Sequence, residues 1–286
     1  MKRLRSLLPF RDDASGQALV LTGSGRSGTT WLAELLAGSL GARLVFEPFR
    51  PGVVGELSGI NNRQYMRPDA EQPRIHEGVE RILRGSLRSR WTDRYNDRFF
   101  YHLRIVKAIR ANLMVGWMLE QFPEIRLVHV VRNPLATMSS QDRGGWKIGL
   151  EKFTSQPELV ADYLAPFIPL IEQADAPDRI SALHWAIENH VPVRQFESGR
   201  WPRDRFRIFS YEDLLGDRDT MAAFLGFAGV TTGSIDWEMV ERPSRVSRGK
   251  TEFGSGRPKM DYSIDTSTYV EKVTAAFGLE RWAGMA

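Results

Sequence analysis

A glycine-rich segment has the composition of an anion-binding loop. It follows a short apolar run, 17–22, and precedes a stretch with apolar residues at helical spacing. In such a turn several backbone N–H groups point at one spot, and the dipole of the following helix adds partial positive charge. We therefore expect a phosphate or sulfate group at Gly23, Ser24, Gly25, Arg26, Ser27, Gly28, Thr29 and Thr30.

Three ligand classes compete for this loop. The spacing fits the P-loop frame G-x-x-x-x-G-K-[ST], but Thr29 stands where the lysine belongs, which argues against a kinase or NTPase. Gly23, Gly25 and Gly28 also spell the dinucleotide fingerprint G-x-G-x-x-G. Glu47 follows the second expected strand, where a ribose-binding acid would lie, so an NAD(P)-dependent oxidoreductase is the alternative function. The third class is a single 5′-phosphate, with an arginine and threonine hydroxyls as further donors.

A second anion-type segment follows the apolar run 126–131. Arg132 stands at the expected strand end, and Pro134 suits the first turn of a helix. Ser140 comes two helical turns later, so its hydroxyl and the Arg132 guanidinium can converge on one anion. An ordinary strand-to-helix cap would have the same residues, so this segment alone does not decide.

Together the two segments resemble motifs of sulfotransferases that use 3′-phosphoadenylyl sulfate (PAPS). Residues 25–32 resemble the 5′-phosphosulfate loop of that family, in which a basic residue precedes S-G-T-T. Arg132, Asn133 and Pro134, with Ser140, resemble its 3′-phosphate motif. The resemblance implies PAPS as co-substrate, no metal, and transfer of the sulfuryl group to a hydroxyl with release of 3′,5′-ADP.

Further positions match the family less closely. Tyr211 takes the place of its nucleotide-contacting tyrosine, and Trp31 that of the aromatic residue that stacks on adenine in cytosolic members. Arg248 or Arg257 would belong to a loop, 245–260, that closes over the 3′-phosphate. The resemblance thus implies these nucleotide-binding residues: Gly25, Arg26, Ser27, Gly28, Thr29, Thr30, Trp31, Arg132, Ser140, Tyr211, Arg248 and Arg257.

The resemblance also implies three catalytic residues. Arg26 matches the basic residue that offsets charge on the leaving phosphate. Lys107 matches the lysine of the cytosolic K-T-H run, but Ala108 follows it, so no histidine base stands there. Phe46, Glu47 and Pro48 resemble the F-E-P segment of carbohydrate-type members, whose glutamate is the proposed base. We expect Glu47 to accept the proton of a carbohydrate, lipid or small-molecule hydroxyl.

Strand ends must position these residues. Short apolar runs predict strands at 17–22, 44–46, 100–106, 126–131 and 206–210, separated by helical patterns. The alternation predicts an α/β, P-loop-like single domain with a central, mostly parallel sheet flanked by helices, and ligands at the carboxyl ends of its strands. The expected helices cover 31–40, 108–122, 157–174 and 178–198, with others starting at 134 and after 210.

Composition narrows the classes of protein further. The chain has 286 residues, of which 42% are hydrophobic, so it has ample core and is not intrinsically disordered. It has no cysteine and no zinc-like histidine spacing, so neither disulfides nor a metal site is expected. The net charge of +4 indicates no partner by itself. The 32 Arg against 7 Lys fit phosphate recognition, and equally a GC-rich genome.

The remaining expectations concern segments and location. Residues 1–15 are expected to form a surface tail, and 16–286 the sulfotransferase domain. The Arg-rich stretch 61–98 is expected to be a solvated, partly helical cap, and it lacks the interleaved aromatics of a nucleic-acid binder. No apolar run approaches the roughly 18 residues that cross a bilayer, and the apolar stretch after the basic start is too short for a signal peptide. The cytoplasm is therefore the expected location.

Overall fold

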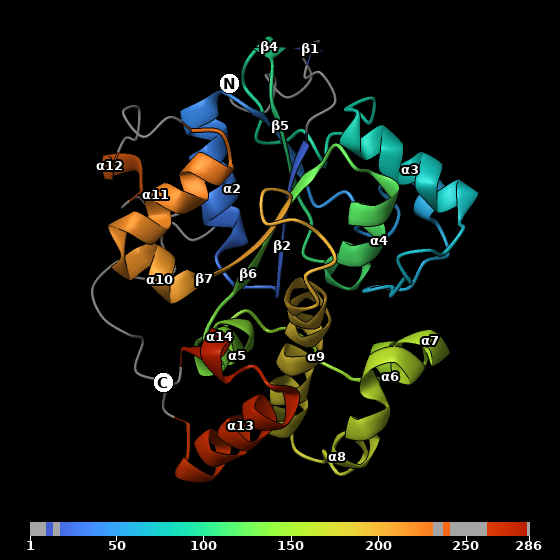
Figure 1. Cartoon of the computed structure of the whole chain (residues 1–286), viewed down its shortest axis with the longest axis vertical. Helices are drawn as coiled ribbons and strands as arrows, with labels where there is room; N and C mark the ends of the chain where they lie inside the picture. Colours follow the sequence, from blue (N-terminus) through green and yellow to red (C-terminus); the bar gives the residue numbers. More distant parts are fainter. Residues whose placement is uncertain (1–9, 14–17, 231–236, 241–261, 285–286) are drawn as a thin grey trace.

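A five-stranded parallel sheet lies at the centre of the molecule (Figure 1). The computed structural model describes residues 10–13, 18–230, 237–240 and 262–284. The strands are β2 (Ala18–Gly23), β3 (Arg43–Phe46), β5 (Arg104–Lys107), β6 (Arg126–Val131) and β7 (Phe206–Ser210). Their order is β3-β5-β2-β6-β7 and all neighbours are parallel, so β2 is in the middle.

Helices cover both faces of this sheet because both faces are apolar. They are α2 (Thr29–Leu40), α3 (Pro73–Leu83), α4 (Val115–Gln121), α9 (Pro177–Glu197), α10 (Tyr211–Gly216), α11 (Arg218–Phe227) and α12 (Trp237–Val240). Ala18 and Val20 of β2 pack into one core with α3, α4 and α9, whereas Leu19 and Leu21 pack into the other with α2 and α11. Burial of a strand on two sides is typical of parallel sheets, and the predicted α/β class is confirmed.

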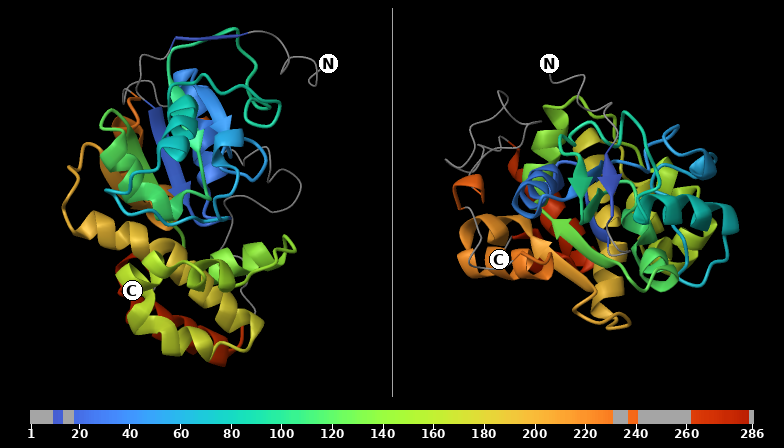
Figure 2. Two further views of the ribbon diagram at one scale, coloured as in Figure 1. Left: turned by 90° about the vertical axis from the view of Figure 1, so that its right-hand side faces the viewer. Right: turned by 90° about the horizontal axis from the view of Figure 1, so that it is seen from above.

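A second group of helices lies beyond the carboxyl ends of the strands, and Figure 2 shows the sheet and this group one above the other. It comprises α5 (Pro134–Asp142), α6 (Glu151–Thr154), α7 (Pro157–Leu159), α8 (Ile168–Glu172), α13 (Ile264–Phe277) and α14 (Glu280–Ala283). The helix α9 joins the two parts, since it packs against β7 and α4 in the first and against α5 and α13 in the second. Of the helices in the described ranges, none has the length and apolar content of a membrane span.

Of the three long helices predicted at 108–122, 157–174 and 178–198, only the last agrees closely with the structure, and it continues through Pro192. The expected helix 178–198 is α9, but the expected helix 157–174 is divided into α7, η3 (Val160–Leu164), η4 (Ala165–Phe167) and α8. Pro166 and Pro169 lie in that stretch, and each removes a backbone donor and crowds the preceding turn. The expected helix 108–122 is shorter than predicted, because a turn and η2 (Asn112–Met114) precede α4.

The predicted strand 100–106 is in fact two strands. The first, β4 (Phe100–Tyr101), pairs with β1 (Arg11–Asp12) in a separate two-stranded sheet, and only the second, β5, joins the central sheet. Within the expected surface tail 1–15, Arg11 and Asp13 are exposed as predicted, but the Asp12 side chain is not. The Asp12 side chain is fully buried and accepts hydrogen bonds from Arg43 at 2.9 Å and from Arg104 at 2.8 Å.

The Arg-rich stretch 61–98 is partly helical and largely exposed or half-buried, but one face of its helix belongs to the core. Its helix α3 buries Val79, Ile82 and Leu83 in the core, and η1 (Gly55–Leu57) packs beside that helix. The three apolar residues recur at helical spacing, so they form one face while the arginines occupy the other.

Loss of the Asp12 carboxylate should destabilise the fold. Asp12→Asn leaves Arg104 buried with no carboxylate partner in the described part of the chain, which should cost about 3–5 kcal/mol of unfolding free energy at pH 7. Urea unfolding measures this difference. Asp13→Asn is the matched control, because Asp13 pairs with Arg11 at the surface, where an ion pair contributes about 0–1 kcal/mol.

The destabilisation by Asp12→Asn should disappear at low pH. Burial raises the pKa of Asp12, but the hydrogen bonds and charges of Arg104 and Arg43 outweigh burial and lower this pKa below its ordinary value of 3.8. The stabilisation is thus present above that value and disappears as the pH falls through the lowered pKa. A difference between wild type and Asp12→Asn that persists at low pH would contradict the ion-pair explanation.

Candidate functional site

Each central strand delivers a candidate residue at its carboxyl end. Gly23 ends β2 and Lys107 ends β5, while Glu47, Arg132 and Tyr211 directly follow β3, β6 and β7. Because β2 is the middle strand, the glycine loop is central in this edge of the sheet. Glu47 and Lys107 flank it on one side, and Arg132 and Tyr211 flank it on the other.

The glycine loop lies against two aromatic rings. Gly28 has φ +89°, and a Cβ atom there would lie 2.3 Å from the Tyr211 ring. A Cβ atom on Gly25 would lie 2.3 Å from the ring of Trp146. Both positions therefore need glycine for space. Helix α2 begins at the next residue, Thr29, so its N-terminal N–H groups lie at this loop.

Arg26 connects the two predicted anion motifs. Its Nε atom donates to the Ser140 hydroxyl at 2.9 Å, and its carbonyl oxygen accepts from Arg132 Nη1 at 2.9 Å. Gln141 Nε2 donates to the Gly25 carbonyl oxygen, also at 2.9 Å. Two segments that are more than a hundred positions apart in the chain thus meet at one point.

The charges at this point favour an anion. Burial, and then the charges of Arg132 and Arg143, lower the pKa of Arg26. Within the described residues no carboxylate forms a salt bridge with any of these three arginines. Among the same residues, Ser27 Oγ and Arg132 Nε are buried without a hydrogen-bond partner. A phosphate or sulfate would supply both the charge and the missing acceptors.

Tyr211 and Trp31 lie beside the arginines. The Arg132 guanidinium is 4.7 Å from the Tyr211 ring centroid, and burial raises the pKa of that tyrosine. Trp31 contacts the Tyr211 ring edge-on at 5.8 Å. The Trp31 indole is itself buried and donates to the Val240 carbonyl oxygen at 3.1 Å, so adenine could stack on it only after local rearrangement.

Glu47 and Lys107 form a buried ion pair. Lys107 Nζ donates to one oxygen of the Glu47 carboxylate, and Arg110 Nη1 donates to the other at 2.8 Å. The backbone N–H of Glu47 also donates to the Lys107 carbonyl oxygen at 2.8 Å. Arg110 did not emerge from the sequence, although it stands in the loop directly after β5, where a site residue is expected.

A further buried charge pair lies close to Glu47. Arg63 Nε donates to Glu188 Oε1 of α9, and both side chains are almost completely buried. Burial, and then the charge of Arg110, lower the pKa of Arg63 to about 10, while Glu47 acts in the opposite direction. Arg63 is thus electrostatically coupled to Glu47 and Arg110. The sequence did not indicate the Arg63–Glu188 pair, because the two residues are 125 positions apart.

Backbone strain coincides with these side chains. In the described part of the chain, three residues other than glycine have positive φ: Arg26 (78°), Glu47 (47°) and Arg63 (68°). Such conformations cost about 1–3 kcal/mol each and persist mainly where a site requires them. Two of the three are predicted catalytic residues, and the third is their neighbour.

Amide and indole side chains from neighbouring elements hold the loops in place. Asn112 Oδ1 accepts from the Gly23 N–H at 3.1 Å, and Asn189 of α9 donates to the Ser24 hydroxyl at 3.1 Å. Trp185, one turn before Asn189, donates to the Arg132 carbonyl oxygen at 2.9 Å. The helix α9 therefore positions both anion motifs from behind.

Two predicted positions lie outside the described residues. The expected nucleotide-closing loop 245–260, with Arg248 and Arg257, stays a prediction. Within the glycine loop, Ser27 and Thr29 are buried and Thr30 is half-buried.

A glycine loop between the central strand of a parallel sheet and the next helix is the arrangement of the P-loop-like α/β proteins, and this chain has it. The chain belongs to the sulfotransferase family, because the model of that family matches residues 18–232, which span all five central strands. It is therefore a transferase enzyme. No curated protein matches the chain.

Solved sulfotransferase structures are similar to this chain over most of its length. Mouse SULT7A1 complexed with PAP is 15% identical, with 94% of this chain and 86% of that chain covered and a TM-score of 0.48. STF9 from Mycobacterium avium is 16% identical, with 93% and 77% covered and a TM-score of 0.47. The sulfotransferase domain from the curacin biosynthetic pathway is 14% identical, with 95% and 98% covered and a TM-score of 0.42.

Gly28→Ala should disturb the loop because its methyl group would overlap the Tyr211 ring at a left-handed backbone position. We expect a loss of about 2–5 kcal/mol in unfolding free energy, measured with urea. In a Tyr211→Ala background only the backbone part, about 1–2 kcal/mol, should remain. Equal losses in the two backgrounds would show that the ring contact is not the cause.

Gly226→Ala is the matched control for this substitution. Gly226 lies in α11, where a methyl group would meet nothing within 4 Å and the backbone has an ordinary helical φ. Alanine should therefore leave the stability unchanged or raise it by up to about 1 kcal/mol.

Proposed function

We propose that the enzyme transfers the sulfuryl group of PAPS to a hydroxyl group of a carbohydrate, lipid or small molecule and releases 3′,5′-ADP. The observation that carries this proposal is the junction at Arg26, which contacts Ser140 through its side chain and Arg132 through its carbonyl oxygen. The glycine loop and the Arg132 and Ser140 segment can bind the two phosphate groups of one nucleotide only if they are adjacent. Here they are in direct contact.

The residues present fit a doubly phosphorylated nucleotide. The loop N–H groups and Arg26 would hold the 5′-phosphosulfate, while Arg132 and Ser140 would hold the 3′-phosphate. Arg132 Nε and Ser27 Oγ, buried without a partner in the described residues, are available for these contacts. Tyr211 would flank the nucleotide, since its ring already lies over Gly28 and beside Arg132.

Glu47 is the proposed base. When bound, PAPS supplies a sulfuryl group on a phosphate leaving group. A carboxylate has about four acceptor positions, and Lys107 and Arg110 occupy two in Glu47, so a hydroxyl proton can still be accepted. Lys107 and Arg26 would offset negative charge that develops on the transferred and leaving groups. The Glu47 carboxylate and the Lys107 ammonium are both buried, which favours a fixed orientation of these two groups before substrate binds.

The dinucleotide alternative has less support. An oxidoreductase would use the glycine loop for a pyrophosphate and Glu47 for a ribose hydroxyl. The dinucleotide scheme assigns no role to the two cations that contact Glu47, Lys107 and Arg110. It also assigns none to Arg132 and Ser140. The family match also gives this alternative no support.

Ligand-induced stabilisation tests the nucleotide. We expect 3′,5′-ADP to raise the melting temperature, by an amount equivalent to about 2.7 kcal/mol at a concentration a hundredfold above Kd, whereas NADH and ATP should not. Arg132→Ala should weaken 3′,5′-ADP binding about tenfold or more, because a charge-assisted hydrogen bond contributes about 1.5–3 kcal/mol. Arg84→Ala, at an exposed arginine of the α3 C-cap, is the control. Stabilisation by NADH alone would overturn the proposal.

Substitution of the base tests the chemistry separately. Glu47→Gln should retain stabilisation by 3′,5′-ADP, which demonstrates a folded nucleotide site, and should lower the rate of sulfuryl transfer by about 10²–10⁴-fold. The rate is measured as 3′,5′-ADP formation from PAPS with a panel of hydroxyl acceptors. If turnover of an accepted substrate survives the substitution, another residue is the base.

A further inference from the structure

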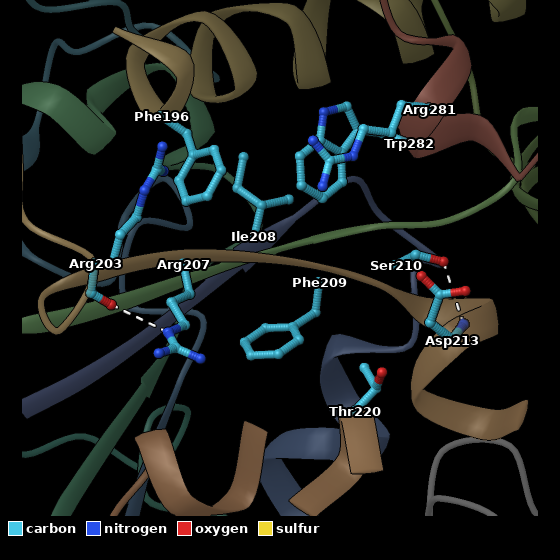
Figure 3. A pocket seen from close by; sticks show the side chains of 10 residues that line it. All are labelled: Phe196, Arg203, Arg207, Ile208, Phe209, Ser210, Asp213, Thr220, Arg281 and Trp282. Carbon is cyan, nitrogen blue, oxygen red and sulfur yellow. Dashed lines mark hydrogen bonds between the residues drawn. The ribbon is translucent and has the colours of Figure 1, made fainter. Parts of the chain in front are cut away.

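A hollow of about 360 Å³ lies along the free edge of the central sheet, and none of its lining residues is among those proposed to hold PAPS. Its floor is β7, the last strand in the sheet order (Figure 3). Phe196, Ile208 and Trp282 lie on one side of this strand, and Arg207, Phe209 and Thr220 lie on the other. The hollow therefore extends along both sides of the strand edge, beside Ile208.

The backbone of β7 can accept another strand. The N–H of Leu127 in β6 donates to the Arg205 carbonyl oxygen at 2.8 Å, and the register pairs Leu127 with Phe206. Successive residues of a parallel strand alternate between the two neighbours, so the N–H and C=O of Ile208 face away from β6. Within the described residues no strand pairs with β7 on this side. Unpaired edge groups are a template for an added strand.

The side chains around this edge select a negative partner. Arg203, Arg207 and Arg281 line the hollow against a single carboxylate, Asp213. In the described part of the chain none of the three arginines forms a salt bridge. Trp282 is more than nine-tenths buried, and among the same residues its Nε1 has no hydrogen-bond acceptor. The three arginines thus have no carboxylate partner among these residues, and the Trp282 N–H is a donor without an acceptor.

The cations are also held in position by aromatic rings. The Arg203 guanidinium lies 3.5 Å from the Phe196 centroid, and Arg281 lies 5.0 Å from that of Trp282. Arg207 Nε donates to the Arg203 carbonyl oxygen at 3.1 Å. Stacking reduces the entropy that these side chains would lose on binding an anion.

We propose that this edge binds an acidic segment of a partner protein in extended conformation, as an added strand beside β7. A small anion would use the arginines but not the backbone of Ile208. A second copy of this chain would bring the same three arginines to the interface, and like charges would oppose that pairing. Residues 241–261 of the chain itself carry six Arg and Lys against three Asp and Glu, so their charge does not fit either.

Charged side chains on an edge strand also prevent aggregation with other edges. That role would not require a hollow beside the strand. It would not require a buried indole N–H without an acceptor either. Both features instead fit a seat for a specific chain, and charge selection then excludes the wrong edges. The proposal is independent of the PAPS proposal, since no residue of the hollow is assigned to sulfuryl transfer.

Peptide binding to the full chain tests the proposal. The probe is a fluorescent peptide of about nine residues with alternating Glu and Val, compared with the Lys and Val peptide and with a Glu and Val peptide N-methylated at alternate residues. We expect fluorescence anisotropy to give Kd values about tenfold higher or more for both comparison peptides, because one loses the charge pairing and the other the backbone hydrogen bonds. Equal binding of the N-methylated peptide would reduce the site to an anion site and overturn the strand proposal.

Substitutions locate the binding. Arg207→Glu and Arg281→Glu should each raise the Kd of the acidic peptide about tenfold or more. Arg84→Glu, at the exposed C-cap of α3, should leave this Kd within about twofold. Hydrogen exchange should show protection of the Ile208 amide when the peptide is bound. Absence of binding, unchanged affinity in both variants, or protection of a different segment would each overturn the proposal. The proposal would also be overturned if the chain self-associates and either variant changes that self-association.

Discussion

The way in which the chain neutralises its arginines determines where a ligand can bind. Arg104 and Arg63 are buried against carboxylates of the protein, because a buried charge without a partner would destabilise the fold severely. Arg26 and Arg132 are half-buried next to one another, and the described residues provide neither with a salt bridge. An anion between them would relieve their repulsion. Arg104 and Arg63 thus differ in their partners from the two arginines proposed to bind the nucleotide.

The Glu47–Lys107 pair shows that a structural role and a proposed chemical role can coincide. Phe46 and Lys107 occupy the same register in neighbouring strands, so the ion pair links the ends of β3 and β5. The Glu47 side chain is held by two cations, and its backbone N–H donates to the Lys107 carbonyl oxygen, so the carboxylate has little freedom to turn away from the site. The sheet that creates the edge thus also orients the group proposed to work there.

The features that could be predicted from the sequence are those encoded over short distances. The glycine loop lies on one strand–loop–helix unit and Arg132 and Ser140 lie on another, so sequence spacing alone was enough to predict where each of them stands on its unit. The central sheet followed from apolar runs in the same way. Asp12 and the Arg63–Glu188 pair could not be found, because each joins residues far apart in the chain and only the fold shows them to be adjacent. The prediction of one helix at 157–174 was wrong for a local reason. It followed the apolar spacing and gave too little weight to the two prolines.

The left-handed backbone at Arg26 and Glu47 has a consequence for evolution and for engineering. Glycine would relieve the strain at either position, so selection for heat resistance alone would favour it there. The same exchange would remove the guanidinium or the carboxylate. Durability and turnover are thus opposed at these two positions, and a hardier enzyme must be obtained from sites that hold no strained side chain.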